Sequence, residues 1–196
     1  MNSKKYFTLL LILYVMNNSY SQNELPFSKI PDSPKEISSA TITARMIQGV
    51  GFRYYWATEG LTEKELLYKP SLDAQSSYQT LEHIYELATT INNAGSSSPN
   101  IRPLKEIPDN FEDLRKETLF KLEEASLKFL SAQSDDLNNM KLIFKRTSGE
   151  YTFPIWNLIN GPISDVIYHT GQIISFRRTC GNPVPKGVNV FMGIKN

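Results

Sequence analysis

Two side chains that can hold a metal ion lie one helical turn apart near the C-terminal end of the sequence. The stretch SDVIYHTGQI, residues 164–173, places Asp165 four residues before His169. Positions four apart on an α-helix lie about 40° apart around its axis, so both side chains project from one face. A carboxylate oxygen and an imidazole nitrogen at this spacing can reach one ion. The alternative is an ordinary histidine that only makes hydrogen bonds at the border of a helix.

The third ligand has to come from another part of the chain. The only other histidine, His83, lies in TLEHIYEL. At about 100° per residue, His83 falls at the border of the apolar stripe of its segment, and His169 is similarly placed on its own. Residues at such borders line clefts between helices. Two histidines and one carboxylate form a donor set that suits Zn, Ni, Fe or Mn. Three protein ligands leave coordination positions of the ion open for water or substrate.

Further polar and aromatic residues are candidates for a site around such an ion. Glu86 lies three residues after His83. It is a candidate fourth ligand or general base, and the alternative is a solvated or salt-bridged carboxylate. Gln172 is suited to support a metal ligand by hydrogen bonding. The aromatic cluster of Phe52, Tyr54, Tyr55 and Trp56 is either a platform for substrate or part of the core or of a dimer interface. The candidate pocket residues are Arg53, Tyr54, Trp56, Tyr85, Asn157, Asn160 and Gln172.

Helical periodicity predicts the elements that position these residues. We expect helices over residues 35–59, from Ser76 to the NNAGSSSPN loop, and over residues 109–132 and 154–178. Ser33 is the expected cap of the first helix, and Ser76 with Gln79 has the spacing of a capping box. Pro162, inside the last helix, removes a backbone hydrogen bond and predicts a kink or a restart there.

The remaining segments contain no strand pattern long enough for a central sheet. Two short alternating runs around residues 147–149 predict a β-hairpin between the third and fourth helices. The connector after the first helix has room for one helical turn, and the tail after Gly181 is expected to extend across the helices. The predicted fold class is therefore all-α, a four-helix bundle with one small β-hairpin.

The N-terminal residues have the pattern of a signal peptide. Lys4 and Lys5 precede an apolar run over residues 6–16, which is shorter than the roughly 20 residues that span a bilayer. Ser19 and Ser21 suit cleavage before Gln22. We therefore expect a signal peptide over residues 1–21, an irregular lead-in over 22–34 and a bundle domain over 35–196. The protein would be exported, periplasmic or secreted, without a stable membrane span; the alternative is an uncleaved anchor.

Charge and cysteine content limit the possible partners and chemistry. The chain has 196 residues, of which 40% are hydrophobic, enough for one domain with a sizeable core. Removing Lys4 and Lys5 with the signal peptide changes the net charge from +1 to −1, and there is no basic stripe, so no nucleic-acid partner is expected. Cys180 is the only cysteine and cannot form an internal disulfide. It is either an inert thiol near a helix end or one activated by neighbouring arginines.

Several quoted segments together resemble the DinB-like (YfiT-like) superfamily. These are LEHIYEL, the first-helix and connector stretch FRYYWATEGLTEKELLYKPS, and PIWNLINGPISDVIYHTGQIISFRR. The most specific piece is HTGQI, which matches the H-x-G-Q-I ending of the family. The resemblance covers residues 36–183. It implies a four-helix bundle with a metal site, often assembled as a homodimer.

The resemblance also implies which residues are the metal ligands. Typical members carry one histidine on helix two and two on helix four, four residues apart, and these positions fall on His83, Asp165 and His169. Asp165 departs from the usual histidine. An aspartate is able to ligate and makes the site more anionic, or else it marks weaker binding or a different metal.

The activities of the family are diverse and include thiol-dependent transferases and isomerases. The sequence therefore predicts a metal-dependent hydrolase or a thiol-type transferase of unspecified substrate. Export favours hydrolysis, because low-molecular-weight thiols are mainly intracellular. The alternatives are a non-catalytic binding module and a dimeric structural bundle whose metal site has degenerated.

Overall fold

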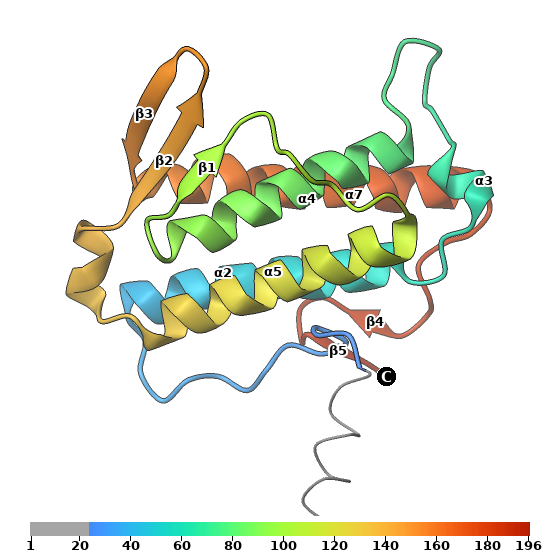
Figure 1. Cartoon of the computed structure of the whole chain (residues 1–196). Helices are drawn as coiled ribbons and strands as arrows, with labels where there is room; N and C mark the ends of the chain where they lie inside the picture. Colours follow the sequence, from blue (N-terminus) through green and yellow to red (C-terminus); the bar gives the residue numbers. More distant parts are fainter. Residues whose placement is uncertain (1–23) are drawn as a thin grey trace, which may run out of the picture.

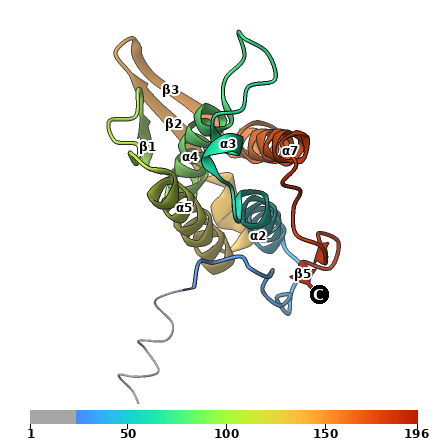
Figure 2. The same cartoon turned by 90° about the vertical axis from the view of Figure 1, so that its right-hand side faces the viewer.

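Four long helices form the body of the protein, as seen in a computed structural model that describes residues 24–196. They are α2 (Ser39–Thr58), α4 (Ser77–Ala94), α5 (Phe111–Ser131) and α7 (Ser164–Thr179). Viewed end-on in Figure 2, they lie at the corners of a square, and α2 and α4 each pack against both α5 and α7. Their buried faces meet along the middle, where the core includes Ile47, Tyr54, Leu81, Ile84, Leu119, Leu122, Phe129, Val166 and Ile173.

The beginnings of the helices show which local signals decided the boundaries. The predicted cap of α4 is confirmed, because Ser76 Oγ accepts from the Gln79 amide at 3.2 Å and Gln79 Oε1 accepts from the Ser76 amide at 2.9 Å. The predicted cap of the first helix was wrong. Ser38, with Thr41, caps α2 reciprocally, while Ser33 accepts a hydrogen bond from Arg45. A reciprocal capping box satisfies two backbone donors, and a lone serine before a proline satisfies at most one.

The last helical run is interrupted where the sequence predicted a kink. It consists of α6 (Trp156–Leu158), the π-helical turn η2 (Ile159–Ile163) and α7. Gly161 has non-helical dihedral angles, with φ −94° and ψ −106°. Pro162 follows it and lacks the amide hydrogen that a continuous helix needs there. The break separates the short entry helix from α7, which carries Asp165 and His169.

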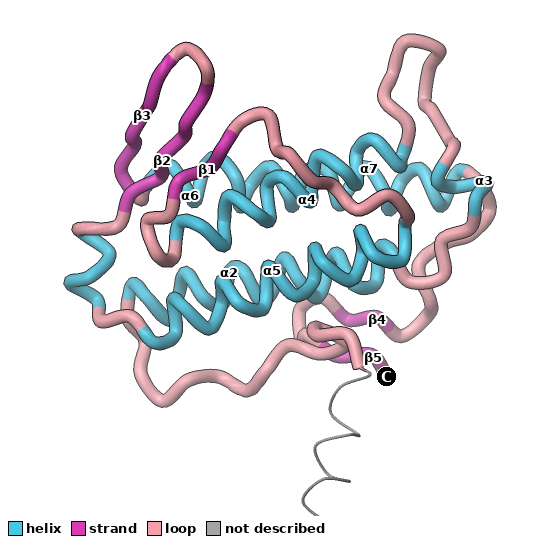
Figure 3. The backbone as a smooth tube through the Cα atoms, viewed as in Figure 1, coloured by secondary structure: helices cyan, strands magenta, loops and turns pink. Residues whose placement is uncertain are grey.

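A small sheet projects from one end of the helices (Figures 1 and 3). Strands β2 (Lys141–Arg146) and β3 (Gly149–Pro154) pair in antiparallel register between α5 and α6. A third strand, β1 (Pro99–Ile101), pairs in parallel with β2 and was not predicted. The three-residue strand has no periodicity of its own, and the buried Asn100 anchors it by donating to the Ile143 carbonyl at 3.0 Å. The 3₁₀-helix η1 (Ser134–Asn138) leads into β2.

The remaining segments connect the ends of the long helices. The predicted helical turn after α2 is α3 (Glu63–Leu66), and the C-terminal tail forms β4 (Val188–Asn189) and β5 (Ile194–Lys195). The tail lies beside the lead-in, where the Ile30 amide donates to the Gly193 carbonyl at 2.8 Å. Among the helices of residues 24–196, none combines the length and apolar character needed to cross a membrane. The predicted signal peptide over residues 1–21 and its cleavage site at Ser21/Gln22 lie outside the described residues.

A buried arginine joins the ends of α2 and α7. Arg177 is 2% exposed, and its Nη1 donates to the carbonyls of Trp56, Ala57 and Glu59 at 3.1, 2.9 and 3.0 Å. These carbonyls are at the end of α2, where helical carbonyls have no partner within the helix. Its Nε donates to the Asn182 carbonyl at 2.7 Å. Arg177 therefore caps α2 from α7 and fixes the position of α7 along α2.

Candidate metal centre

The two histidines and Asp165 meet between α4 and α7, which lie side by side in the fold (Figure 1). One ligand atom from each of the three residues lies within 4.8 Å of the other two. His83 Nε2 is 3.3 Å from Asp165 Oδ2, and His169 Nε2 is 3.3 Å from Asp165 Oδ1. The two oxygens of one carboxylate thus face one imidazole each. The predicted ligands His83, Asp165 and His169 are brought together.

The neighbouring buried residues explain why these side chains point toward one another. On α4, Leu81 and Ile84 are fully buried in the core and flank His83 in the sequence. On α7, Val166 and Thr170 are buried and each follows one of the candidate ligands directly. Because the core fixes the rotation of both helices, the three polar side chains are held along the seam between them.

Gln172 determines which nitrogen of His169 is free. Gln172 Oε1 is 2.7 Å from His169 Nδ1, and Gln172 Nε2 donates to the Tyr168 hydroxyl at 3.3 Å. A carbonyl oxygen only accepts hydrogen bonds, so His169 is the donor and its proton is on Nδ1. In a neutral imidazole with this tautomer, the lone pair is on Nε2 and is directed at Asp165. This is the arrangement by which a supporting residue orients a histidine ligand. The contact itself fits the supporting role predicted for Gln172, and the contact with Tyr168 was not predicted.

The contact between His169 and Asp165 is electrostatically favourable when a proton or a metal cation lies between the two atoms. A neutral His169 directs the Nε2 lone pair at a carboxylate oxygen, and two electron-rich atoms at 3.3 Å repel one another. Either a second proton on the imidazole or a metal cation between the two atoms relieves the repulsion. Imidazole nitrogen and carboxylate oxygen are both ligands of Zn²⁺ and of other divalent transition metals. The donor set therefore fits a divalent metal ion.

The candidate centre is open on one side. The side chains of His83 and Asp165 are 39% and 42% exposed, whereas that of His169 is 16% exposed. The ring of His169 is packed between His83 and Tyr168, with ring centres at 4.8 and 5.1 Å. Water or a small molecule can therefore approach the carboxylate and His83 while His169 stays fixed. Such an open position distinguishes a reactive metal site from a closed structural one.

Glu86 is engaged elsewhere. Its carboxylate oxygen Oε2 lies 3.5 Å from Arg102 Nη1. Arg102 Nη2 also donates to the Glu86 backbone carbonyl at 3.1 Å and to Thr90 Oγ1 at 2.8 Å. Of the two interpretations of Glu86, the salt-bridged carboxylate is the one observed. Within residues 24–196, the cluster that can hold a metal consists of His83, Asp165 and His169 without Glu86.

The two tyrosines among the candidate pocket residues are buried among the helices. Tyr54 is fully buried in the core, and burial raises the pKa of its hydroxyl to about 12. Tyr85 is 7% exposed, and Lys121 Nζ lies 5.2 Å from its ring centre. Burial, followed by the charges of Glu117 and Glu106, raises the pKa of Tyr85. Both side chains thus contribute to packing rather than to the open side of the cluster.

The other candidate pocket residues line two separate cavities. Arg53 and Trp56 border a cavity of about 300 Å³ under the C-terminal tail, against Ile174. Asn157 and Asn160 border one of about 220 Å³ between η2 and the sheet, which Phe144 and Phe153 also line. None of His83, Asp165 and His169 lines either cavity. Of the predicted pocket residues, Gln172 is the one that contacts the cluster directly.

Comparisons with known proteins identify the fold. No protein-family model matches the sequence, and no curated protein matches it significantly. Among solved structures, the crystal structure of YjoA, a DinB-like protein from Bacillus subtilis, is similar with a TM-score of 0.55. The match covers 74% of this chain and 96% of that chain, at 14% sequence identity. The chain therefore has a DinB-like fold, mostly helical with a small sheet, which confirms the fold implied by its LEHIYEL and HTGQI segments.

Proposed function

We propose that this protein is a divalent-metal-binding member of the DinB-like four-helix-bundle type, with His83, Asp165 and His169 as its metal ligands. The observation that carries the proposal is the convergence of two imidazole Nε2 atoms on the two oxygens of one carboxylate, each at 3.3 Å. Gln172 orients the imidazole ring of His169 through its contact with Nδ1, and His83 contributes the third ligand from the neighbouring helix. Zn, Ni, Fe and Mn all accept this donor set.

The reaction that we propose is metal-dependent hydrolysis or group transfer. A divalent ion in such a site acts as a Lewis acid and makes a coordinated water or thiol more acidic. The residues of the chain contribute binding and orientation. Asp165 adds negative charge that holds the cation, and the Tyr168–Gln172–His169 chain of contacts fixes the half-buried His169. The exposed side of His83 leaves space for a substrate.

The second candidate is a metal-binding bundle without turnover. It is favoured by the ion pair between Glu86 and Arg102, because Glu86 was the candidate general base and its carboxylate is engaged in that pair. Dimerisation of such a bundle remains a prediction. A substrate screen separates the two candidates, because turnover that depends on added metal and disappears in the His83→Ala variant excludes a purely binding role.

Metal content of tag-free protein tests the proposal shared by both candidates. Inductively coupled plasma mass spectrometry should find near-stoichiometric Zn, Ni, Fe or Mn in the purified wild type, and loss of that metal in His83→Ala and in His169→Ala. The Glu86→Ala variant is the control and should retain the metal, because Glu86 pairs with Arg102. A wild-type protein that remains metal-free after incubation with each ion contradicts the proposal.

We also propose that the protein is exported and processed. The support is the sequence pattern of Lys4 and Lys5, the apolar run over residues 6–16 and the small residues at 19 and 21. Expression of the full chain in a bacterial host followed by N-terminal sequencing should recover a protein in the periplasm or medium that begins at Gln22. Recovery of the intact N-terminus from membranes would indicate an uncleaved anchor instead.

A further inference from the structure

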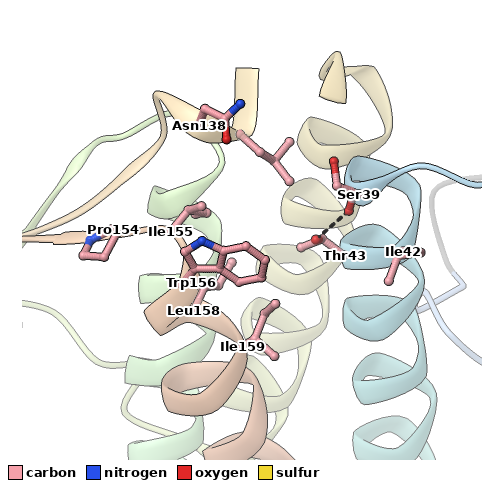
Figure 4. A pocket seen from close by; sticks show the side chains of 10 residues that line it. Ser39, Ile42, Thr43, Asn138, Pro154, Ile155, Trp156, Leu158 and Ile159 are labelled. Atoms are coloured by element: carbon pink, nitrogen blue, oxygen red, sulfur yellow. Dashed lines mark hydrogen bonds between the residues drawn. The ribbon is translucent and has the colours of Figure 1, made fainter. Parts of the chain in front are cut away.

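An apolar cavity lies between the beginning of α2 and the short helix α6, which precedes η2 and α7. Its volume is about 430 Å³, within the range of about 300–1,000 Å³ that is typical of small-molecule sites. Figure 4 shows its walls, with Trp156 extending between α6 and the first turns of α2. The lining residues are Ser39, Ile42, Thr43, Leu137, Asn138, Pro154, Ile155, Trp156, Leu158 and Ile159.

The lining has a simple chemical character. None of the ten lining residues is charged, and most are aliphatic or aromatic. Burial of a charged group against such walls without a counter-ion is unfavourable, so the cavity selects against ions. Trp156 is 74% exposed and Ile42 is 51% exposed. A ligand that covers these side chains removes apolar surface from water, which is the main favourable term in binding of this kind.

A few polar groups at the cavity remain available to a ligand. The Thr43 hydroxyl is already used, because it donates to the Ser39 carbonyl at 2.8 Å (Figure 4). The Ser39 hydroxyl, the Asn138 amide and the Trp156 indole nitrogen belong to exposed residues of the lining. These groups offer both donors and an acceptor at an otherwise apolar site. Such a combination fixes the orientation of a small ligand.

We propose that this cavity binds a neutral, largely apolar small molecule that has a single hydrogen-bonding end, such as a long-chain or aromatic alcohol. The apolar body lies against Trp156, Ile159 and Ile42, and the polar end meets Ser39 and Asn138. The site is separate from the candidate metal centre, because none of its lining residues belongs to the His83, Asp165 and His169 cluster. Binding is therefore independent of metal and does not rest on the proposed metal function.

Fluorescence of N-phenyl-1-naphthylamine, a neutral dye that brightens in apolar surroundings, tests the proposal on the full mature chain. We expect saturable binding that 1-decanol displaces, and decanoate should displace it about tenfold less well because the walls hold no cation. Ser39→Trp fills the cavity and Trp156→Ala removes a wall, and each should weaken dye binding about tenfold or more. Ser175→Trp, which places the same indole on exposed α7, is the matched control and should bind like the wild type.

Four results would overturn the proposal. The first is that the wild type shows no saturable dye binding. The second is that Ser39→Trp and Trp156→Ala, both folded by circular dichroism, bind the dye as tightly as the wild type. The third is that decanoate displaces the dye better than 1-decanol, and the fourth is that dye binding disappears in His83→Ala. Sedimentation of the wild type and Trp156→Ala adds one more criterion. A wild-type dimer that becomes monomeric in Trp156→Ala would show that a second copy of the chain, rather than a small molecule, covers the cavity.

Discussion

His83 Nε2 lies 3.3 Å from Asp165 Oδ2, although 82 positions separate the two residues in the chain. The other oxygen of the same carboxylate is equally close to His169 Nε2. Asp165 is thus the central member of the cluster, between the imidazoles of two different helices. Because the family resemblance implies a histidine at this position, the charge of Asp165 is the feature that most distinguishes this candidate site.

Substitution of Asp165 separates the effect of its charge from that of its ligand atom. Asp165→Asn keeps the shape but removes the negative charge and leaves a poor metal ligand, so we expect Zn²⁺ affinity to fall about tenfold or more. Asp165→His supplies a neutral imidazole and should retain binding. Isothermal titration calorimetry at pH 7.5 measures both. Equal affinities for the wild type and Asp165→Asn would show that the carboxylate is not a ligand.

Gln172 provides a test of the supporting contact. Gln172→Leu removes the acceptor from His169 Nδ1, and loss of such a contact typically lowers metal affinity about 10- to 100-fold. Gln172→Glu retains an acceptor oxygen and should bind metal at least as well as the wild type. Competition with a coloured chelator reports both constants. If the Leu variant binds like the wild type, the contact between Gln172 and His169 does not orient the ligand.

Local signals were the most predictable part of this fold. The Ser76–Gln79 capping box depends on residues three apart and was identified directly from the sequence. The kink at Gly161–Pro162 follows from the chemistry of proline alone. Ser38 was missed in favour of Ser33 because both serines precede the same apolar pattern, and the choice depended on the reciprocal partner Thr41.

Contacts between distant segments were less predictable. The three residues of the candidate metal site could be grouped from the sequence. Asp165 and His169 have the spacing of a helical ligand pair, and the family resemblance added His83 to them. No sequence pattern links Arg102 to Glu86. Likewise, the three-residue β1 exists only because β2 supplies its partners, such as Ile143 opposite Pro99, 44 positions further along the chain.

Arg177 is predicted to be essential for stability rather than for metal binding. Arg177→Met leaves the carbonyls at the end of α2 buried without their donor, which we expect to cost about 3 kcal/mol of unfolding free energy. Arg178→Met changes the exposed neighbour and should stay within about 0.5 kcal/mol of the wild type. Urea unfolding followed by circular dichroism compares the two. Similar midpoints for both variants would contradict the capping role of Arg177.

Glu65 should make stability sensitive to acid. Its burial alone would raise its pKa, but hydrogen bonds from the hydroxyl and amide of Thr62 and from Asn182 hold the pKa of the folded state below 4.5. A carboxyl with a lowered folded pKa stabilises the protein above its unfolded pKa, and this contribution is lost as pH falls through the folded value.

The acid dependence of unfolding checks this sign. Urea midpoints measured from pH 6 downwards should fall less steeply for Glu65→Gln than for the wild type, because the neutral amide does not titrate. The exposed neighbour supplies the control, and Glu63→Gln should follow the wild-type curve. A wild-type slope that persists in Glu65→Gln would assign the acid sensitivity to other carboxyl groups.

Calorimetric titration of Zn²⁺ into metal-free protein shows directly whether His83, Asp165 and His169 form a metal site. The wild type should bind one ion per chain, and both His83→Ala and His169→Ala should lose that binding event while remaining folded by circular dichroism. Glu86→Ala should bind one ion like the wild type. Absence of saturable binding would contradict the proposed metal site. Binding of Zn²⁺ by His83→Ala and His169→Ala with the stoichiometry and affinity of the wild type would contradict it equally.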